Sequence, residues 1–496
     1  MRYFLGIDIG TSSTKAVLMA RDGTVVHTCA PAYDFVTPRP LWAESNPADW
    51  WVATQAACRE MVAKAGGAAN IAAVGLTGQM HGLVLLDAAG QVLRPCIMWN
   101  DQRTAAQCAA ITARVGAARV LQLTGNPVLP GFTAGKVVWV RENEPDIYAR
   151  AAKILLPKDY IRYLLSGEYF SEVSDASGTS LLDVARRTWS DEMLEGCGIP
   201  RSWLPELTES TVASTKVSAS AAATTGLLAG TPIIAGGGDQ AAQAVGCGIV
   251  KEGIISATLG TSGVVFAHSD RYRVEPQGRL HAFCHAVPGK WHLMGVMLSA
   301  AGSYAWYRDN LASGVSYNDL NAEAATVLPG SEGLYFLPYL SGERTPHPDP
   351  LARGAFVGLT LRHRRAHLTR AVLEGVTYGM RDSLELMRDL GISPSTVIAS
   401  GGGAASPFWR QMQADIYGAT IQTVNATEGA AFGAAVLAGV GVGAYSSVEA
   451  ACSETLKVTS EVKQGANASR YASLYPGYRS LYPALKAEFA AISRAE

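Results

Sequence analysis

The sequence predicts an α/β protein made of two domains that share one plan. Its 496 residues exceed what one hydrophobic core commonly supports. A unit of apolar run, Gly-Thr-Ser turn and second apolar run occurs twice, starting near residues 3 and 254. Strand-like runs also alternate with helix-like patterns, which is typical of layered α/β folds.

The first half begins with the first copy of this unit. Residues 3–9 (YFLGIDI) form the first strand, and the run KAVLMA follows the turn at 10–13. Asn46-Pro47 predicts a helix start, because Asn is a preferred N-cap and Pro suits the first helical position. The runs IAAVGLTG (71–78) and TPIIAGGGD (231–239) predict buried strands, since each is short, apolar and followed by glycine.

The second half repeats these patterns. IISATL (254–259) runs into the turn at 260–263, and VIASGGG (397–403) predicts a further strand. A second echo joins the halves: GGGDQAAQAVGCG (236–248) and TEGAAFGAAVLAG (427–439) both indicate a loop that leads into a helix of small residues. We therefore expect domains at 1–248 and 249–496, a hinge near 248–252, and a last helix able to pack back on the first domain.

Composition excludes several classes of function. Lys plus Arg total 41 against 42 for Asp plus Glu, so neither a nucleic acid nor a membrane surface is an expected partner. The eight cysteines are scattered and show no zinc-ligand spacing, which favours a reducing compartment. The uncharged stretch 429–448 is mostly Gly and Ala, which indicates a packed core helix rather than a membrane span. We expect a cytoplasmic protein.

Two turns and a glycine run are candidate phosphate and nucleotide sites. Backbone N–H groups in such turns bind phosphate oxygens, and glycine permits close approach of a ligand to the backbone. The candidate residues are Thr11, Ser12, Ser13, Lys15, Gly260, Thr261, Gly401, Gly402 and Gly403. Each turn alone is a weak signal, and Gly401–Gly403 also suits a plain tight turn.

Two carboxylates occupy the ends of predicted strands. Asp8 ends the first strand, and Asp239 follows a triple glycine before a helix, where α/β sheets place ligand groups. Asp8 also suits a solvated turn, and Asp239 a helix N-cap. No Walker A loop is present in the sequence. From the residues alone, the substrate stays open.

Two long motifs indicate which family of proteins the chain resembles. Residues 131–143 (GFTAGKVVWVREN) and 354–375 (GAFVGLTLRHRRAHLTRAVLEG) resemble the two signatures of the FGGY carbohydrate kinases, and the resemblance runs essentially end to end. It implies two ribonuclease H-like domains around a central cleft, as in the actin, hexokinase and Hsp70 ATPase superfamily. It also implies ATP and Mg²⁺, with Asp8 orienting the metal and Asp239 as the catalytic base.

Shorter segments are most similar to bacterial xylulokinases, among them GQMHG (78–82), WNDQR (99–103) and LPYLSGERTPH (337–347). That similarity implies a pentulose, D-xylulose, phosphorylated on O5. Met80, His81, Asp239 and Gln240 would contact the sugar, whereas glycerol kinases carry Arg-Glu in place of Met80-His81.

The chain departs from the pattern at three places. Gln240 stands where xylulokinases commonly have Asn, 426–433 (ATEGAAFG) replaces a proline-containing segment, and Gly135 replaces a Pro. Kinases for ribulose, gluconate or glycerol, and a sugar-sensing ATPase without kinase activity, remain alternatives. Retention of both Asp8 and Asp239 favours the enzyme, because a sensor needs no base. Whether the protein forms a homodimer is open.

Overall fold

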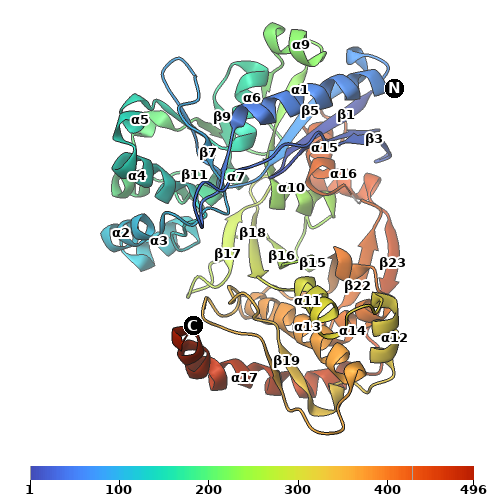
Figure 1. The fold of residues 1–496 in the computed structure, drawn as a ribbon. Coiled ribbons are helices and arrows are strands. Elements are labelled where there is room, and N and C mark those ends of the chain that lie inside the picture. The colour runs from blue at the N-terminus through green and yellow to red at the C-terminus, as the bar shows by residue number, and fades with distance from the viewer. Residues whose placement is uncertain (1, 427, 496) are drawn as a thin grey trace.

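The computed structural model describes residues 2–426 and 428–495 and contains two large mixed sheets flanked by helices (Figure 1). Strands of the first half form a six-stranded sheet, and strands of the second half form a seven-stranded sheet. Figure 1 shows the two sheets one above the other, with α10 (Asp239–Gly246) and α15 (Gly429–Gly441) between them. Thr427, at the start of the predicted small-residue helix, lies outside the described residues.

The first sheet places three strand ends at one edge. In spatial order its strands are β13 (Ala213–Lys216), β14 (Pro232–Gly238), β5 (Ile71–Gly78), β1 (Tyr3–Ile9), β2 (Thr14–Met19) and β3 (Val25–Cys29). β14, β5 and β1 run parallel, whereas β2 returns antiparallel to β1. The residues that follow β1, β5 and β14 therefore emerge side by side.

Alternation along β1 explains which helices cover each face. Leu5 and Ile7 share a buried cluster with Trp50 of α1 (Pro47–Lys64) and Ile161 of α6 (Pro157–Ser166). Gly6 faces the opposite way, where a Cβ would overlap the carbonyl of Ala431 in α15. Successive side chains of a strand point to opposite faces, so one apolar and one glycine face follow directly from the sequence. The predicted helix start is confirmed, since the side chain of Asn46 caps α1.

The second sheet repeats the arrangement. Its strands are β17 (His281–Cys284), β18 (Trp291–Met297), β16 (Gly263–Ser269), β15 (Ile254–Leu259), β21 (Thr396–Ser400), β22 (Thr420–Val424) and β23 (Val458–Val462). β15 and β21 run parallel, as β1 and β5 do. The helices α13 (Arg365–Asp389) and α14 (Pro407–Tyr417) pack on it, and α11 (Ala301–Leu311) and α12 (Tyr317–Ala325) pack in turn on α13.

The two echoed small-residue helices, α10 and α15, pack directly on each other. A Cβ on Gly433 would overlap the carbonyl of Ala242, so the two backbones touch. The end of α10 also reaches the second sheet, where Ala244 and Ile249 cluster with Phe266 and Ile398. This pair therefore joins the two halves of the chain. Among the described residues, no helix combines the length and apolar character needed to cross a membrane.

The last helix does not follow the expectation for it. α17 (Ala468–Ala495) packs against α13, α14 and β19 (Tyr335–Leu337) of the second half, and α15 is the helix that returns to the first sheet. The reason is a stripe of tyrosines on α17. Tyr471 donates a hydrogen bond to Glu374 and Tyr475 donates one to Asp382, both on α13. These partners are absent from the first sheet's surface of small residues.

A separate helical cluster extends the first half. Its helices are α2 (Ala105–Val115), α3 (Ala117–Thr124), α4 (Thr133–Asn143), α5 (Pro145–Arg150) and α8 (Asp191–Cys197). Val120, Val137 and Met193 are among the residues of its own hydrophobic core. The loops between these helices approach β17 and β18 of the second half, as Figure 1 shows. They form one wall of the site described next.

Candidate active site

Asp8 and Asp239 lie at neighbouring strand ends. In the sheet register Asp8 pairs with Thr77 of β5, and Gly237 of β14 pairs with the same Thr77. Asp239 is the first residue of α10, directly after β14. The structure thus brings together the two carboxylates that the sequence predicted from separate strands.

Their environment raises both pKa values. Burial, opposed in part by the charge of Lys15, raises the pKa of Asp8 to about 6. Burial and then the negative charge of Asp8 raise the pKa of Asp239 to about 7, although Asp239 accepts a hydrogen bond of 2.7 Å from the backbone N–H of Gln240. A carboxylate with a pKa near neutrality is well matched to accept a proton at physiological pH.

Asp8 also has capacity for a metal-bound ligand. Its Oδ1 is buried and has no hydrogen-bond partner among the residues that the structure describes. Within 2–426 and 428–495, no group of three or more His, Cys, Asp and Glu side chains is able to hold a metal ion by itself. Mg²⁺ in phosphoryl-transfer sites is commonly held by one or two carboxylates and by substrate phosphates. Asp8 with Asp239 fits that donor set.

A buried charge network supports the strand end before Asp239. Lys158 lies 2.7 Å from Asp159, 3.2 Å from Asp175 and 3.5 Å from Glu172, all fully buried. Glu172 accepts a hydrogen bond from Ser174 Oγ, which in turn accepts one of 3.1 Å from the N–H of Gly238.

The segment that contains Glu172 and Ser174 continues to Gly178, which holds the ring of His81 in one orientation. The Nδ1 of His81 lies 2.7 Å from the carbonyl oxygen of Gly178, so Nδ1 carries the proton and Nε2 is left as an acceptor. The ring stacks on Phe132 with 4.3 Å between centroids. Burial lowers the pKa of His81 to about 3, so the ring is neutral. The side chain of Met80 packs against both Gly238 and Gly178. Met80 therefore connects the surroundings of His81 with the strand end that precedes Asp239.

A cavity of about 560 Å³ opens beside His81. Both halves line it, with Trp99 and Phe132 from the first and His281, Glu343 and Arg344 from the second among its lining residues. His81 lines the cavity, whereas Met80, Asp239 and Gln240 do not. Its size and its mixture of aromatic and hydrogen-bonding groups suit a small polyhydroxy ligand.

Several of these lining residues were not predicted as site residues. Trp99 belongs to the quoted WNDQR segment, and its Nε1 donates a hydrogen bond of 3.1 Å to Thr11 of the first turn. Phe132 is the second residue of the first signature motif, 131–143. His281 carried no sequence signal of its own.

The first turn presents free N–H groups. Its carbonyls at Gly10 and Ser13 accept hydrogen bonds from the hydroxyl of Tyr33, at 2.7 and 2.9 Å. The N–H groups of Thr11, Ser12 and Ser13 donate none within the described protein. Lys15 forms an ion pair of 2.7 Å with Glu428 at the start of α15, so its ammonium already has a partner.

The second turn, at 260–263, likewise uses its carbonyl groups for hydrogen bonds within the protein and leaves N–H groups available. The carbonyls of Gly260 and Thr261 accept hydrogen bonds from the N–H groups of Ala301, Ala300 and Gly302, whereas the N–H groups of Thr261 and Ser262 have no acceptor among the described residues. Gly401 has a φ of +77°, and a Cβ there would lie 2.5 Å from the carbonyl oxygen of Leu259. Glycine is therefore required for the 401–403 segment to lie against this turn.

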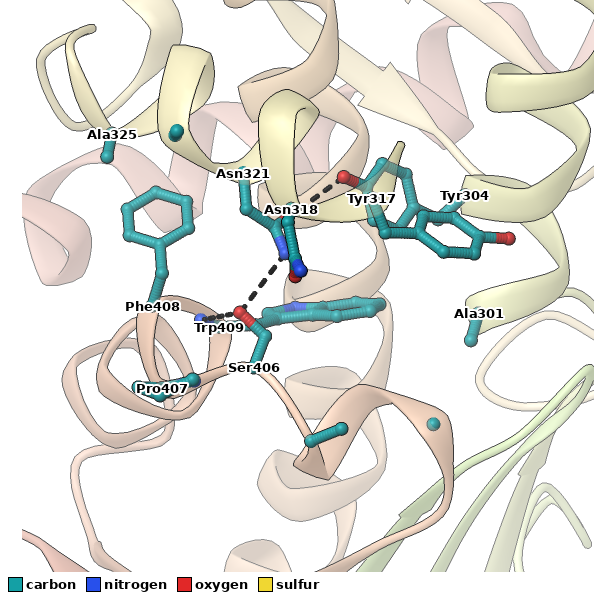
Figure 2. A pocket seen from close by; sticks show the side chains of 13 residues that line it. Ala301, Tyr304, Tyr317, Asn318, Asn321, Ala325, Ser406, Pro407, Phe408 and Trp409 are labelled. Carbon is teal, nitrogen blue, oxygen red and sulfur yellow. Dashed lines mark hydrogen bonds between the residues drawn. The ribbon is translucent and has the colours of Figure 1, made fainter. Parts of the chain in front are cut away.

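Beside that segment lies a cavity of about 680 Å³ (Figure 2). Gly402 lines it, together with Tyr304, Asn318, Ser406 and Trp409. Figure 2 shows the flat Trp409 ring beneath the amides of Asn318 and Asn321. Asn321 accepts a hydrogen bond of 2.9 Å from the hydroxyl of Tyr304 and donates one of 3.3 Å to Ser406. A flat, apolar cavity with amide groups at its edge suits a purine base.

Family models match nearly the whole chain. The N-terminal domain of the FGGY family of carbohydrate kinases matches residues 3–246, and the C-terminal domain matches residues 255–442. This protein belongs to the FGGY family of carbohydrate kinases. It is thus a carbohydrate kinase, for which ATP is the phosphate donor, and its two-domain α/β fold is the fold of FGGY sugar kinases.

Relatives of this FGGY kinase include several xylulose kinases and a gluconokinase. The xylulose kinase of Escherichia coli (strain K12) is 45% identical over 436 residues, covering 88% of this chain and 89% of that protein. The xylulose kinase of Lactococcus lactis is 40% identical over 96% of this chain and 95% of that protein. The gluconokinase of Bacillus subtilis is 33% identical over 90% and 89%. The crystal structure of xylulose kinase from Rhodospirillum rubrum superposes with a TM-score of 0.93 at 32% identity, over 99% of this chain and 100% of that one.

Proposed function

We propose that this FGGY kinase transfers the γ-phosphate of MgATP to O5 of D-xylulose. The observation that carries the proposal is the pair Asp8–Asp239 at adjoining strand ends, beside a cavity that His81 lines. The similarity to xylulose kinases supports the choice of sugar. The eight free cysteines support a cytoplasmic site of action.

In the proposed reaction, Asp239 accepts the proton of the attacking hydroxyl. Asp8 orients Mg²⁺, which neutralises charge on the phosphates. The free N–H groups at 11–13 and 261–262 bind phosphate oxygens, and the cavity at Gly402 and Trp409 holds the adenosine. Both halves line the sugar cavity and both supply phosphate-binding N–H groups, so closure of the two halves on each other brings the reacting atoms together.

The proposal is tested by ADP release across a panel of D-xylulose, D-ribulose, gluconate and glycerol. The highest kcat/KM is expected for D-xylulose, and ATP hydrolysis without sugar is expected to be slow. A higher kcat/KM for gluconate or glycerol would contradict the choice of substrate. ATP hydrolysis at the full rate without any sugar would contradict kinase activity itself.

Replacing His81 with alanine is expected to raise the KM for the sugar far more than the KM for ATP. An unpaired buried polar group commonly costs on the order of 1–3 kcal/mol, which corresponds to about a 5- to 150-fold change. Steady-state kinetics with each substrate varied in turn measures both constants. Equal changes in the two KM values, or no change in either, would remove His81 from the sugar site.

The pH dependence follows from the raised pKa of Asp239. A base must be deprotonated, so kcat/KM is expected to fall as pH drops through about 7. The negative charge of Asp8 contributes to that raised pKa, so Asp8→Asn is expected to move the acid limb to lower pH in whatever activity remains. An acid limb of kcat/KM near the ordinary pKa of Asp would contradict the assignment of Asp239 as the base. A shift of that limb to higher pH in Asp8→Asn would contradict it as well.

A further inference from the structure

His281 is held in one tautomer with a free nitrogen at the cavity. It lies on β17, in the second half, and its Nδ1 is 2.8 Å from the side-chain oxygen of Asn126. An amide oxygen only accepts hydrogen bonds, so Nδ1 carries the proton and Nε2 is an acceptor. The Nε2 of His281 has no partner among the described residues, yet it is not one of the buried unpartnered atoms. His281 lines the cavity, so Nε2 is open to it.

Asn126 is itself anchored across the two halves. It belongs to the loop between α3 and α4, and its amide NH₂ donates hydrogen bonds of 2.9 Å to the carbonyls of Thr124 and Ala282. Because the NH₂ group is engaged in this way, the amide oxygen is the atom that faces Nδ1 of His281. Asn126 is fully buried, and His281 is only 5% exposed. The orientation of the His281 ring is therefore fixed before any ligand binds.

His281 and His81 form a matched pair around Phe132. Their rings lie 5.9 and 4.3 Å from the Phe132 ring, centroid to centroid. Burial and the positive charge of Arg344 lower the pKa of His281 to about 3, so both histidines are neutral acceptors. Two such acceptors, one from each half of the chain, suit two hydroxyl groups of one ligand.

The order of contacts indicates which end of the sugar each histidine meets. Met80 and Gly178 connect His81 with the strand end at Gly238, next to Asp239. His281 contacts Phe132 and Phe283 instead, and because His81 stacks on the same Phe132 ring, the chain of contacts from that strand end reaches His81 before His281. We infer that His281, oriented by Asn126, is a specificity-determining residue that accepts a hydrogen bond from the sugar hydroxyl remote from the phosphorylated one. This inference rests on the proposed function, in which that hydroxyl is O1 of D-xylulose.

The test compares D-xylulose with 1-deoxy-D-xylulose. The wild-type protein is expected to show a KM for the deoxy sugar about 2- to 12-fold higher, the usual value of one neutral hydrogen bond. In His281→Phe the two sugars are expected to have equal KM values, with the KM for ATP unchanged. His281→Gln, which returns an acceptor oxygen near the position of Nε2, is expected to restore part of the difference.

His292→Phe is the matched control. His292 lies on the neighbouring strand β18, is buried and stacked on Phe266, and does not line the cavity. This variant is expected to keep the wild-type discrimination between the two sugars. Thermal melting of each variant confirms that it is folded.

Equilibrium binding of each sugar, followed by tryptophan fluorescence without ATP, separates the inference from the proposed function. Wild-type discrimination retained in His281→Phe, in both KM and Kd, would overturn the inference and leave the kinase proposal standing. Normal binding of D-xylulose by the wild-type protein with no phosphorylation would overturn the kinase proposal. Kd values for the two sugars that are equal in His281→Phe but different in the wild-type protein would support the inference.

Discussion

Asp239→Asn is expected to lower kcat by about 10²- to 10⁴-fold, the usual contribution of a positioned general base. The amide keeps the shape of the side chain and can still accept the backbone hydrogen bond from Gln240, so the start of α10 is expected to be retained. It cannot take the proton of the sugar hydroxyl. Steady-state kinetics, with sugar binding measured separately, checks both expectations.

Asp49→Asn provides the control for this change. Asp49 also lies in the first turn of a helix, α1, but is exposed and remote from the strand ends. Its replacement is expected to leave kcat unchanged. A near-wild-type kcat in Asp239→Asn would remove Asp239 as the base.

Asp8→Ala is expected to lower kcat by about 10²- to 10³-fold, as loss of one preorganised electrostatic group commonly does, and to raise the Mg²⁺ concentration needed for half-maximal rate. The reason is the buried Oδ1 of Asp8, which has no hydrogen-bond partner in the described part of the chain and is available to a metal-bound ligand. Activity titrated with Mg²⁺ measures both effects.

Asp22→Ala is the matched control for Asp8. Asp22 lies in the turn after β2, where it accepts a hydrogen bond of 3.0 Å from the N–H of Thr24. Its loss is expected to leave the Mg²⁺ titration unchanged. A normal rate and an unchanged Mg²⁺ profile in Asp8→Ala would remove Asp8 as the residue that orients the metal.

Much of the frame was predictable because its signals are local. The strands at 3–9, 71–78 and 254–259 match β1, β5 and β15, since each is a short apolar run ended by glycine. The two carboxylates could be placed together because parallel strands end at one edge of a sheet. The echo between α10 and α15 was visible because two backbones in contact require small residues at both helices.

The rest depends on contacts between distant segments. Trp99 and Phe132 lie on irregular loops, and His281 lies on a hairpin of the other half, so only the folded chain brings them to one cavity. Trp409 meets Asn318 through the packing of α14 and α12, which no single segment specifies. The spacing of the tyrosines in α17 places them on one face of a helix. The sequence does not show that Glu374 and Asp382 of α13 are their hydrogen-bond partners.

The most direct test of the account is the product formed from D-xylulose and MgATP. NMR of the purified product is expected to show the phosphate on C5, with one ADP formed for each sugar phosphate and neither product formed by Asp239→Asn at a comparable rate. A phosphate on another carbon would contradict transfer to a hydroxyl held at Asp239. Formation of ADP and inorganic phosphate with the sugar unchanged would contradict it as well.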